Sequence, residues 1–580
     1  MKNNKTDTLM NYLLKVTFLL MLGSFVCMPA QAQKRTSRKK MASSPKSMVK
    51  QVEAVNLADT SSPKVVTITS AFKPYLKDAV KVNFTAASPV IDSSKIPVTY
   101  SIPSQNLFFT FQPVAIQPLA LAFDTGYAWN NDHYIKFGAG NFSSVLGEAG
   151  FSFGNGRNAI TNLRGNFVTA TGHLPSQQSA KWGLDILSVL HTKNNHEWTT
   201  HPYYQSSTQY LYGYQPTTLS YPKDQLLQRF NTVGIEIGLQ NKLVNTFGIS
   251  YHPRISLIGF SDNHENQERN LIIKAPINKS FGKIYAIDLE MGADISATTV
   301  QMVPNYLDIK NNLFYVNPSI QLKTPNLKLL AGIRPSWDNQ SFSTLPNITV
   351  EAKVTEVGLV LEAGWIGYYK KNTMRSLAGM NPFIGQLSGL QNTRIREQYA
   401  GIKGATGNHF TYEVKASLLQ LNNQALFVNN LGDGKTFAVL FEPEMKALRL
   451  HGEIGYTVQE KISLIASATY TQYSSLTVNE KPWGLLPIEA TGTVKWKVLK
   501  DLQLKADLFV WEGAAYRDLI LQAKRAGAVA DLNIGAEFAV MPKLAIWLQM
   551  NNLFNATYQR WNQYPVLGTQ VLAGVVYSFR

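Results

Sequence analysis

The chain has 580 residues, a formal net charge of +17 at pH 7 and a single cysteine, Cys27. Cys27 lies in the N-terminal leader, so a disulfide framework and a thiolate metal site are both excluded in the mature chain. No apolar run of about 18 residues follows that leader, so no transmembrane helix is predicted.

The first 32 residues have the pattern of a secretory signal peptide. Lysines come first, an apolar run covers residues 18–26, and Ala32 completes an A-x-A pattern. Cleavage is expected between Ala32 and Gln33. Lipoprotein processing at Cys27 is the weaker alternative, because Val26 stands where a small residue is needed.

The next two segments are predicted to precede the main domain. Residues 33–50 are basic and rich in Ser without one acidic residue, which predicts a disordered basic arm over 33–63. Residues 64–141 contain extended stretches interrupted by proline, as in 96–123, and predict a periplasmic or lumen-lying extension. In an exported protein the positive charge indicates contact with anionic lipid, cell-wall polymer or an acidic periplasmic protein rather than nucleic acid.

Residues 142–580 repeatedly alternate apolar and polar side chains. In KIYAIDLEMGADIS, the apolar positions run from Tyr285 to Ile295 in steps of two, and Asp288, Glu290 and Asp294 lie on the other face. This period of two predicts strands, and no helical period fits it. The same pattern recurs over 233–240, 348–354, 502–510 and 531–540. Strands of nine or more residues exceed the usual five or six of soluble sandwiches.

The connections between these strands alternate between short and long. The expected short turns are at 277–283, 323–328, 354–358, 405–409, 458–461, 498–502 and 540–544. Longer polar stretches occur between them, for example at 261–269 and 194–224. Short periplasmic turns and long external loops are typical of an antiparallel outer-membrane β-barrel.

We therefore predict an all-β transmembrane barrel of about 20 strands, between 18 and 22, that begins near Phe142. The segment 437–456 fits either one strand or two. A lumen of this width is too wide to be filled by wall side chains alone, so it either conducts or is plugged.

Two clusters in 191–214 are candidate binding groups. His191, His196 and His201 recur every five residues, a spacing that puts them on no common face, so a solvated loop is favoured over a metal site. The possible ligand-contacting aromatic residues of the same predicted external loop are Trp198, Tyr203, Tyr204, Tyr210, Tyr212 and Tyr214. Such rings stack on flat ligands, and they are equally expected where strands cross the lipid interface.

No catalytic motif stands in a fitting context, so we expect neither enzymatic activity nor a cofactor nor a resident metal. The charged residues of the polar faces are interpreted as the lining of a lumen. They are Asp288, Glu290, Asp294, Glu351, Lys353, Lys505, Asp507 and Glu537.

The C-terminal stretch 551–579 is similar to the last hairpin of TonB-dependent outer-membrane receptors. The matching residues are Asn552, Leu553, Phe554, Asn555, Tyr558 and Phe579. The resemblance implies a location in the outer membrane of a Gram-negative bacterium, surrounded by its lipid. It also implies that Tyr577 and Phe579 form an assembly signal for the barrel assembly machinery. Arg580 departs from the family by following the terminal aromatic residue, and no ordinary plug domain is recognisable upstream.

These observations give two functional hypotheses. The first is a receptor-like barrel that binds or transports a solute across the outer membrane. The alternative is a structural or assembly barrel that anchors a periplasmic protein through residues 33–123. In the closing strand, Val571, Ala573, Val575 and Tyr577 are expected to face lipid, with Phe579 at the periplasmic rim. Leu572, Gly574, Val576 and Ser578 are then expected to face inward.

Overall fold

A computed structural model describes residues 133–154, 158–302, 304–354, 358–458 and 461–579. The expected signal cleavage between Ala32 and Gln33, the basic arm and the extension up to residue 132 lie outside these residues. No helix among the described residues is both long enough and apolar enough to cross a membrane.

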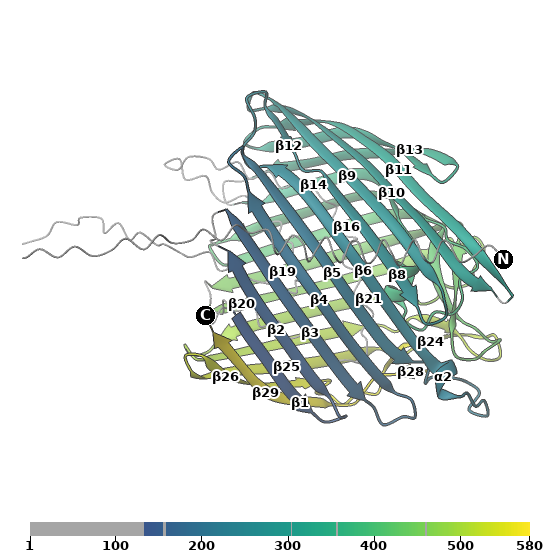
Figure 1. Cartoon of the computed structure of the whole chain (residues 1–580). Coiled ribbons are helices and arrows are strands. Elements are labelled where there is room, and N and C mark those ends of the chain that lie inside the picture. Colours follow the sequence, from purple (N-terminus) through teal and green to yellow (C-terminus); the bar gives the residue numbers. More distant parts are fainter. Residues whose placement is uncertain (1–132, 155–157, 303, 355–357, 459–460, 580) are drawn as a thin grey trace, which may run out of the picture. The chain divides into compact units, whose positions relative to one another are not determined.

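The described residues form a closed, antiparallel barrel of 22 strands (Figure 1). The barrel closes where the last strand pairs with the first, from His133 opposite Phe579 to Gly140 opposite Leu572. In order round the barrel, the wall strands are β1 (His133–Gly140), β2 (Val145–Gly154), β3 (Ala159–Thr171), β4 (Gln178–His191), β5 (His196–Tyr210), β6 (Leu227–Asn241), β8 (Arg254–Asp262), β9 (Gln267–Phe281), β10 (Tyr285–Met302), β11 (Asn305–Lys323), β12 (Leu327–Asp338), β13 (Ser341–Lys353), β14 (Val360–Lys370), β15 (Thr393–Thr406), β16 (Phe410–Asn422), β19 (Met445–Val458), β20 (Ile462–Ser474), β21 (Ile488–Lys497), β22 (Leu502–Trp511), β25 (Val529–Met541), β26 (Leu544–Asn551) and β29 (Gln570–Phe579). The short β7 (Ile249–Tyr251) pairs with β9 beyond the end of β8.

The strands that flank the seven expected short turns all end at the same end of the barrel, the end that also holds Phe579. This end is the periplasmic one. The connections at the other, extracellular end carry the remaining elements. These are α2 (Lys223–Leu226), α3 (Met374–Met380), the hairpin of β17 (Gln424–Asn429) and β18 (Phe437–Glu442), the hairpin of β23 (Ala515–Arg517) and β24 (Ala523–Arg525), and the hairpin of β27 (Gln559–Trp561) and β28 (Tyr564–Pro565).

The alternation of side chains gives an apolar outer face and a polar lumen. On β10, Tyr285 and Ile287 point outward and are 57% and 45% exposed, respectively. The inward residues of several strands form ion pairs. Arg164 lies 3.0 Å from Glu148, Lys403 lies 3.1 Å from Glu362, and Lys505 lies 2.9 Å from Asp507. Of these six charges, only Lys505 and Asp507 belong to the predicted lumen lining, and for them the inward position is confirmed.

The first wall strand, β1, begins at His133, before the start near residue 142 that the sequence predicted. This strand is short, and its inner face carries Lys136 and two glycines instead of a regular polar series. Gly138 is required there, because a Cβ atom would lie 2.2 Å from the Trp547 ring. These features interrupt the long alternating pattern by which the other wall strands are predicted.

The prediction of a loop over residues 194–224 is also wrong for most of that range. Residues 192–195 form a periplasmic turn, β5 covers His196–Tyr210, and the extracellular loop covers only 211–226. The strand is polar because Thr, Gln and Ser occupy much of it, so composition predicted a loop. The segment 437–456 contains two strands, β18 in a loop hairpin and β19 in the wall.

The closing strand has the predicted faces. Val575 and Tyr577 are 44% and 49% exposed on the outside, whereas Leu572 and Val576 are 1% and 2% exposed inside. Phe579 lies at the periplasmic rim, with ring centroids 5.6 Å from His133 and 6.1 Å from Phe151. Aromatic rings of the first and last strands therefore pack against each other at the rim, where the barrel closes.

Candidate functional site

Four extracellular loops fold together at the mouth of the barrel. They are residues 211–226, 371–392, 423–444 and 552–569, here called the cap. They leave the wall between β5 and β6, between β14 and β15, between β16 and β19, and between β26 and β29. Because these positions are distributed round the circumference, loops that contact one another must reach across the mouth.

All four cap loops contribute to one buried apolar cluster. Its members include Leu211, Leu377, Phe427 and Trp561, one from each loop. Phe230 of β6 and other inward wall residues join the same cluster. The largest apolar core among the described residues therefore lies in the cap and not within the wall.

Aromatic rings form the centre of this cluster. Phe383 and Tyr564 stack with their ring centroids 3.6 Å apart, and the Tyr212 ring meets the Tyr564 ring edge-on at 5.2 Å. Trp561 lies 5.1 Å from the Phe427 ring. Such aromatic pairs contribute about 0.5–1.5 kcal/mol each beyond the burial of their surface.

The loop 371–392 is fixed to the lumen wall through its helix α3. The helix begins with a capping box, in which Thr373 and Ser376 bond to each other's backbone N–H groups. Glu268 of β9 accepts a hydrogen bond from the backbone N–H of Met374 at 2.5 Å. Inward amides also bind this loop, since Gln209 donates to the carbonyl of Pro382 at 2.6 Å.

The two ends of the same loop meet at a group of buried amides. Asn311 of β11 donates to the Asn372 carbonyl and to the Asn392 side chain, both at 2.9 Å. Asn392 donates in turn to Asp338 of β12 at 2.7 Å. These three asparagines are at most 1% exposed, and each hydrogen bond fixes loop ends against a wall strand.

The tip of the β17–β18 hairpin interlocks with two other cap loops. Tyr221 donates to the carbonyl of Asp433 at 2.5 Å, and the Tyr564 hydroxyl donates to the carbonyl of Lys435. Gly434 has φ of +62°, and a Cβ atom there would lie 2.1 Å from the carbonyl oxygen of Gln215. Only glycine fits this close approach of two backbones.

Glu442, at the end of β18, binds a neighbouring loop, residues 475–487. Its carboxylate accepts backbone N–H groups of Thr477 at 2.6 Å, Val478 at 2.9 Å and Asn479 at 2.8 Å. The Asn479 amide donates a further bond at 2.8 Å. Burial acts to raise the pKa of Glu442, but these hydrogen bonds outweigh it and lower the pKa.

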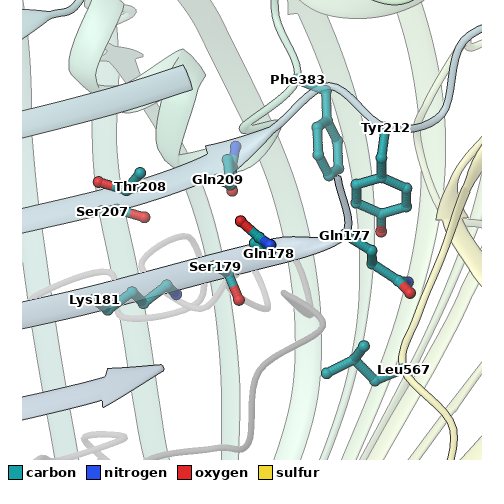
Figure 2. Close-up of a pocket in the computed structure, with 10 residues that line it drawn as sticks. All are labelled: Gln177, Gln178, Ser179, Lys181, Ser207, Thr208, Gln209, Tyr212, Phe383 and Leu567. Carbon is teal, nitrogen blue, oxygen red and sulfur yellow. The ribbon is translucent and has the colours of Figure 1, made fainter. Parts of the chain in front are cut away.

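A narrow crevice with about 10 Å³ of free space, room for about one water molecule, lies between the cap and the wall strands β4 and β5 (Figure 2). Tyr212, Phe383 and Leu567 of the cap line one end, and Lys181 lies toward the other. The remaining lining residues carry amides or hydroxyls: Gln177, Gln178, Ser179, Ser207, Thr208 and Gln209. With the cap closed, this space is too small for an organic solute.

The predicted aromatic group is divided by the structure. Trp198, Tyr203, Tyr204 and Tyr210 lie on wall strand β5. Trp198 is 40% exposed on the outer face, where it fits the lipid-interface alternative. Tyr212 and Tyr214 lie in the cap, and both pack against its buried cluster, as does Tyr210 at the end of β5.

The predicted histidines do not assemble. His191 lies 3.3 Å from Glu197 and His201 lies 3.1 Å from Asp185, so these two bind separate carboxylates. No group of three or more His, Cys, Asp or Glu side chains suited to a metal ion occurs in the described part of the chain.

The C-terminal motif begins the fourth cap loop. Asn552 and Asn555 both adopt left-handed φ angles, of +49° and +50°. The Asn552 amide donates to the carbonyls of Ala556 at 2.9 Å and Leu567 at 2.8 Å, which closes the loop at its base. The Tyr558 hydroxyl donates to Asp531 of β25. The motif therefore directs loop 552–569 into the cap.

Phe383, Trp561 and Tyr564 were not predicted from the sequence. Phe383 lies in an irregular segment, and Trp561 and Tyr564 lie in the β27–β28 hairpin, which is too short to show a period of two. The one available signal was local. WNQYP, at 561–565, and MNPFIG, at 380–385, concentrate aromatic residues next to proline in segments too polar for wall strands.

The barrel was compared with known proteins. Neither a protein-family model nor a curated protein sequence matches the chain. Solved structures do match it, at low sequence identity. The FrpB iron transporter from Neisseria meningitidis (F3-3 variant) has a TM-score of 0.60 and 10% identity, over 77% of this chain and 81% of the transporter.

Two further structures show the same similarity. The siderophore receptor PirA from Acinetobacter baumannii has a TM-score of 0.59 at 10% identity, over 77% of this chain and 80% of PirA. This chain has the barrel fold of TonB-dependent outer-membrane receptors. The ferripyoverdine receptor of Pseudomonas aeruginosa, bound to ferripyoverdine, matches at 0.57 and 10% identity, over 77% of this chain and 71% of the receptor.

The fold and the location predicted from the sequence are thus confirmed: the chain is an outer-membrane β-barrel that resembles these receptors. The matched proteins are transporters and receptors, not enzymes.

Proposed function

We propose that this protein is a receptor-class transporter of the outer membrane, whose barrel admits a solute from outside only when the cap opens. The observation that carries the proposal is the cap itself. Loops from four separate positions on the wall meet in one buried cluster at the mouth. An open diffusion pore has no need for such a cluster, whereas a selective receptor uses one as a gate.

The similar structures support this class of function. FrpB is an iron transporter, PirA is a siderophore receptor, and the Pseudomonas protein binds ferripyoverdine. We propose that the solute is a polar organic molecule that enters between Tyr212, Phe383 and the crevice amides only after the cap opens, because the closed crevice has room for about one water molecule.

The mature chain has no cysteine, which permits a direct test of the gate. A Ser467→Cys variant places one thiol on the lumen side of β20, in register with inward Glu453. In intact cells, a membrane-impermeant maleimide should label it slowly when the cap is native. The rate should rise at least about tenfold when Phe383→Ala and Tyr564→Ala remove the stacked pair.

Two controls make the result specific. Gln522→Cys, on the exposed hairpin tip, should be labelled rapidly in every background. The double change Trp337→Ala and Phe342→Ala removes another ring pair, 5.2 Å apart on β12 and β13, and should leave the rate unchanged. Rapid labelling of the Ser467→Cys variant under the native cap, or slow labelling after cap disruption, would contradict the proposed gate.

A further inference from the structure

The outer faces of β8, β9, β10 and β11 carry an ordered series of side chains toward the extracellular end. The strand register places residues in rows across these neighbouring strands. Two lower rows are mainly apolar: Ile255, Ile273, Ala293 and Phe314 form one, and Leu257, Leu271, Ile295 and Asn312 form the next. Leu257 is 52% exposed and Phe314 is 39% exposed, as expected of side chains in contact with lipid.

The row directly above these apolar rows carries two cations. Its residues are Gly259, Arg269, Ala297 and Lys310, and both cations are exposed. Only the small Ala297 separates them, so their Cα atoms are about 10 Å apart, two strand spacings. Two flexible cations on either side of a small residue can converge on a single phosphate group.

The row above the cations is polar and lines an open cleft. Ser261, Gln267, Thr299 and Asp308 are paired across the strands. The cleft has a volume of about 900 Å³, including its opening to solvent. Its lining consists of Ser261, Asp262, Asn263, Glu265, Gln267, Thr299 and Tyr306.

The carboxylates of this cleft accept hydrogen bonds from neighbouring residues. Asp262 accepts the backbone N–H groups of His264 at 2.8 Å and Asn266 at 3.0 Å. Tyr306 donates to Glu265 at 3.2 Å, and its ring is 59% exposed. An exposed ring beside carboxylates and amides provides both a stacking face and hydrogen-bond acceptors for hydroxyl groups.

We propose that this outer surface binds a phosphorylated glycolipid of the outer leaflet. Its acyl chains would lie on the apolar rows, a phosphate between Arg269 and Lys310, and the saccharide in the cleft beside Tyr306. The surface is continuous with the lipid-facing wall, and its order of chemistry matches the order of groups in such a lipid. A phospholipid without a sugar leaves the cleft and the Tyr306 ring unoccupied. The site lies on the opposite side of the wall from the lumen and is independent of solute transport.

The test is native mass spectrometry of the full-length mature protein, stripped of lipid in detergent. Two probes are added separately: lipid A, a bisphosphorylated disaccharide lipid, and phosphatidylglycerol, which has a phosphate and no disaccharide. The double variant Arg269→Gln and Lys310→Gln should bind lipid A at least about tenfold more weakly than the unmodified protein, a loss of about 1.4 kcal/mol. Tyr306→Ala should weaken lipid A binding and leave phosphatidylglycerol binding unchanged.

The matched control is Lys446→Gln with Lys481→Gln, which removes two exposed cations from β19 and from the loop 475–487. It should keep the lipid A affinity of the unmodified protein. The proposal is overturned if the site and control variants bind lipid A equally well. It is also overturned if Tyr306→Ala affects neither probe, because the cleft then recognises no sugar.

Discussion

Replacing Glu442 with Gln tests how the cap is fastened to its neighbouring loop. The carboxylate is fully buried and accepts three backbone N–H groups and one side-chain amide from residues 477–479. A Gln side chain has nearly the same shape but only one acceptor oxygen. The NH₂ group of the Gln side chain would face the backbone N–H and the side-chain NH₂ of Asn479. Both hydrogen bonds to Asn479 are then lost, because donors face each other.

The magnitude follows from these contacts. A hydrogen bond to a charged group contributes about 1.5–3 kcal/mol, and the two bonds to Thr477 and Val478 become weaker neutral ones. We expect the local free energy of opening of loop 475–487 to fall by about 2–4 kcal/mol. Because the folded pKa of Glu442 is lowered, this stabilisation is fully present above the unfolded pKa of about 4.3. It is lost as the pH falls through the lower folded pKa.

Hydrogen exchange of the purified protein in detergent measures this quantity. Amides of residues 477–479 should exchange about 30-fold or more faster in Glu442→Gln at pH 7, and the difference should shrink under acidic conditions. Glu444→Gln is the matched control, since Glu444 lies two positions away and accepts a bond from Gln420 at 2.9 Å. Equal exchange in both variants at pH 7 would refute the assigned role of Glu442.

Three further changes test other contacts. Phe579→Ser removes the ring that packs on His133 and Phe151 where the barrel closes, so the amount of protein in the outer membrane should fall. Normal amounts would count against the assembly role. Gly434→Ala places an alanine in the left-handed region, at a cost of about 1–2 kcal/mol, and its Cβ atom clashes with the Gln215 carbonyl. Trypsin should therefore cleave the 430–436 tip of this variant faster than it cleaves the same tip in Gly407→Ala. Gly407 is the control because it has a similar φ and a Cβ atom there meets nothing within 4 Å. Glu268→Gln weakens the hydrogen bond to the Met374 N–H, and hydrogen exchange of α3 should rise, while an unchanged rate would show that the capping box alone holds the helix.

The wall strands could be predicted because the pattern that identifies them lies within each short segment of the sequence. Tyr285, Ile287 and Asp288 alternate on one strand, and the period of two alone decides which of them faces lipid. The errors occurred where local composition contradicted the strand. In β1, glycines interrupt the alternating pattern. β5 is rich in Thr, Ser and Gln because its polar residues bind wall and cap partners instead of water.

The cap could not be predicted because its contacts are distant in sequence and follow no period. Phe383 and Tyr564 stack although they lie in the second and fourth cap loops, and Asn311 binds loop ends on both sides of α3. Nothing near Phe383 in the sequence indicates its partner. The C-terminal motif was recognised by resemblance, yet its physical role became evident only from the left-handed Asn552 and Asn555 at the base of loop 552–569.

The contacts of the cap also change how the polar lumen is understood. Gln209, Gln228 and Glu268 are inward polar residues of the kind expected to face water in a channel, yet all three bind backbone groups of residues 374–384. Water can replace these bonds when the loop leaves the wall, so each neutral amide bond contributes only about 0.5–1.5 kcal/mol, and the bond to the Glu268 carboxylate about 1.5–3 kcal/mol. The stacked rings of Phe383 and Tyr564 cannot be replaced in this way. Opening of the proposed gate would therefore break both the wall contacts of loop 371–392 and the contacts between loops, and a solute that stacks on Phe383 in place of Tyr564 would lower the second cost.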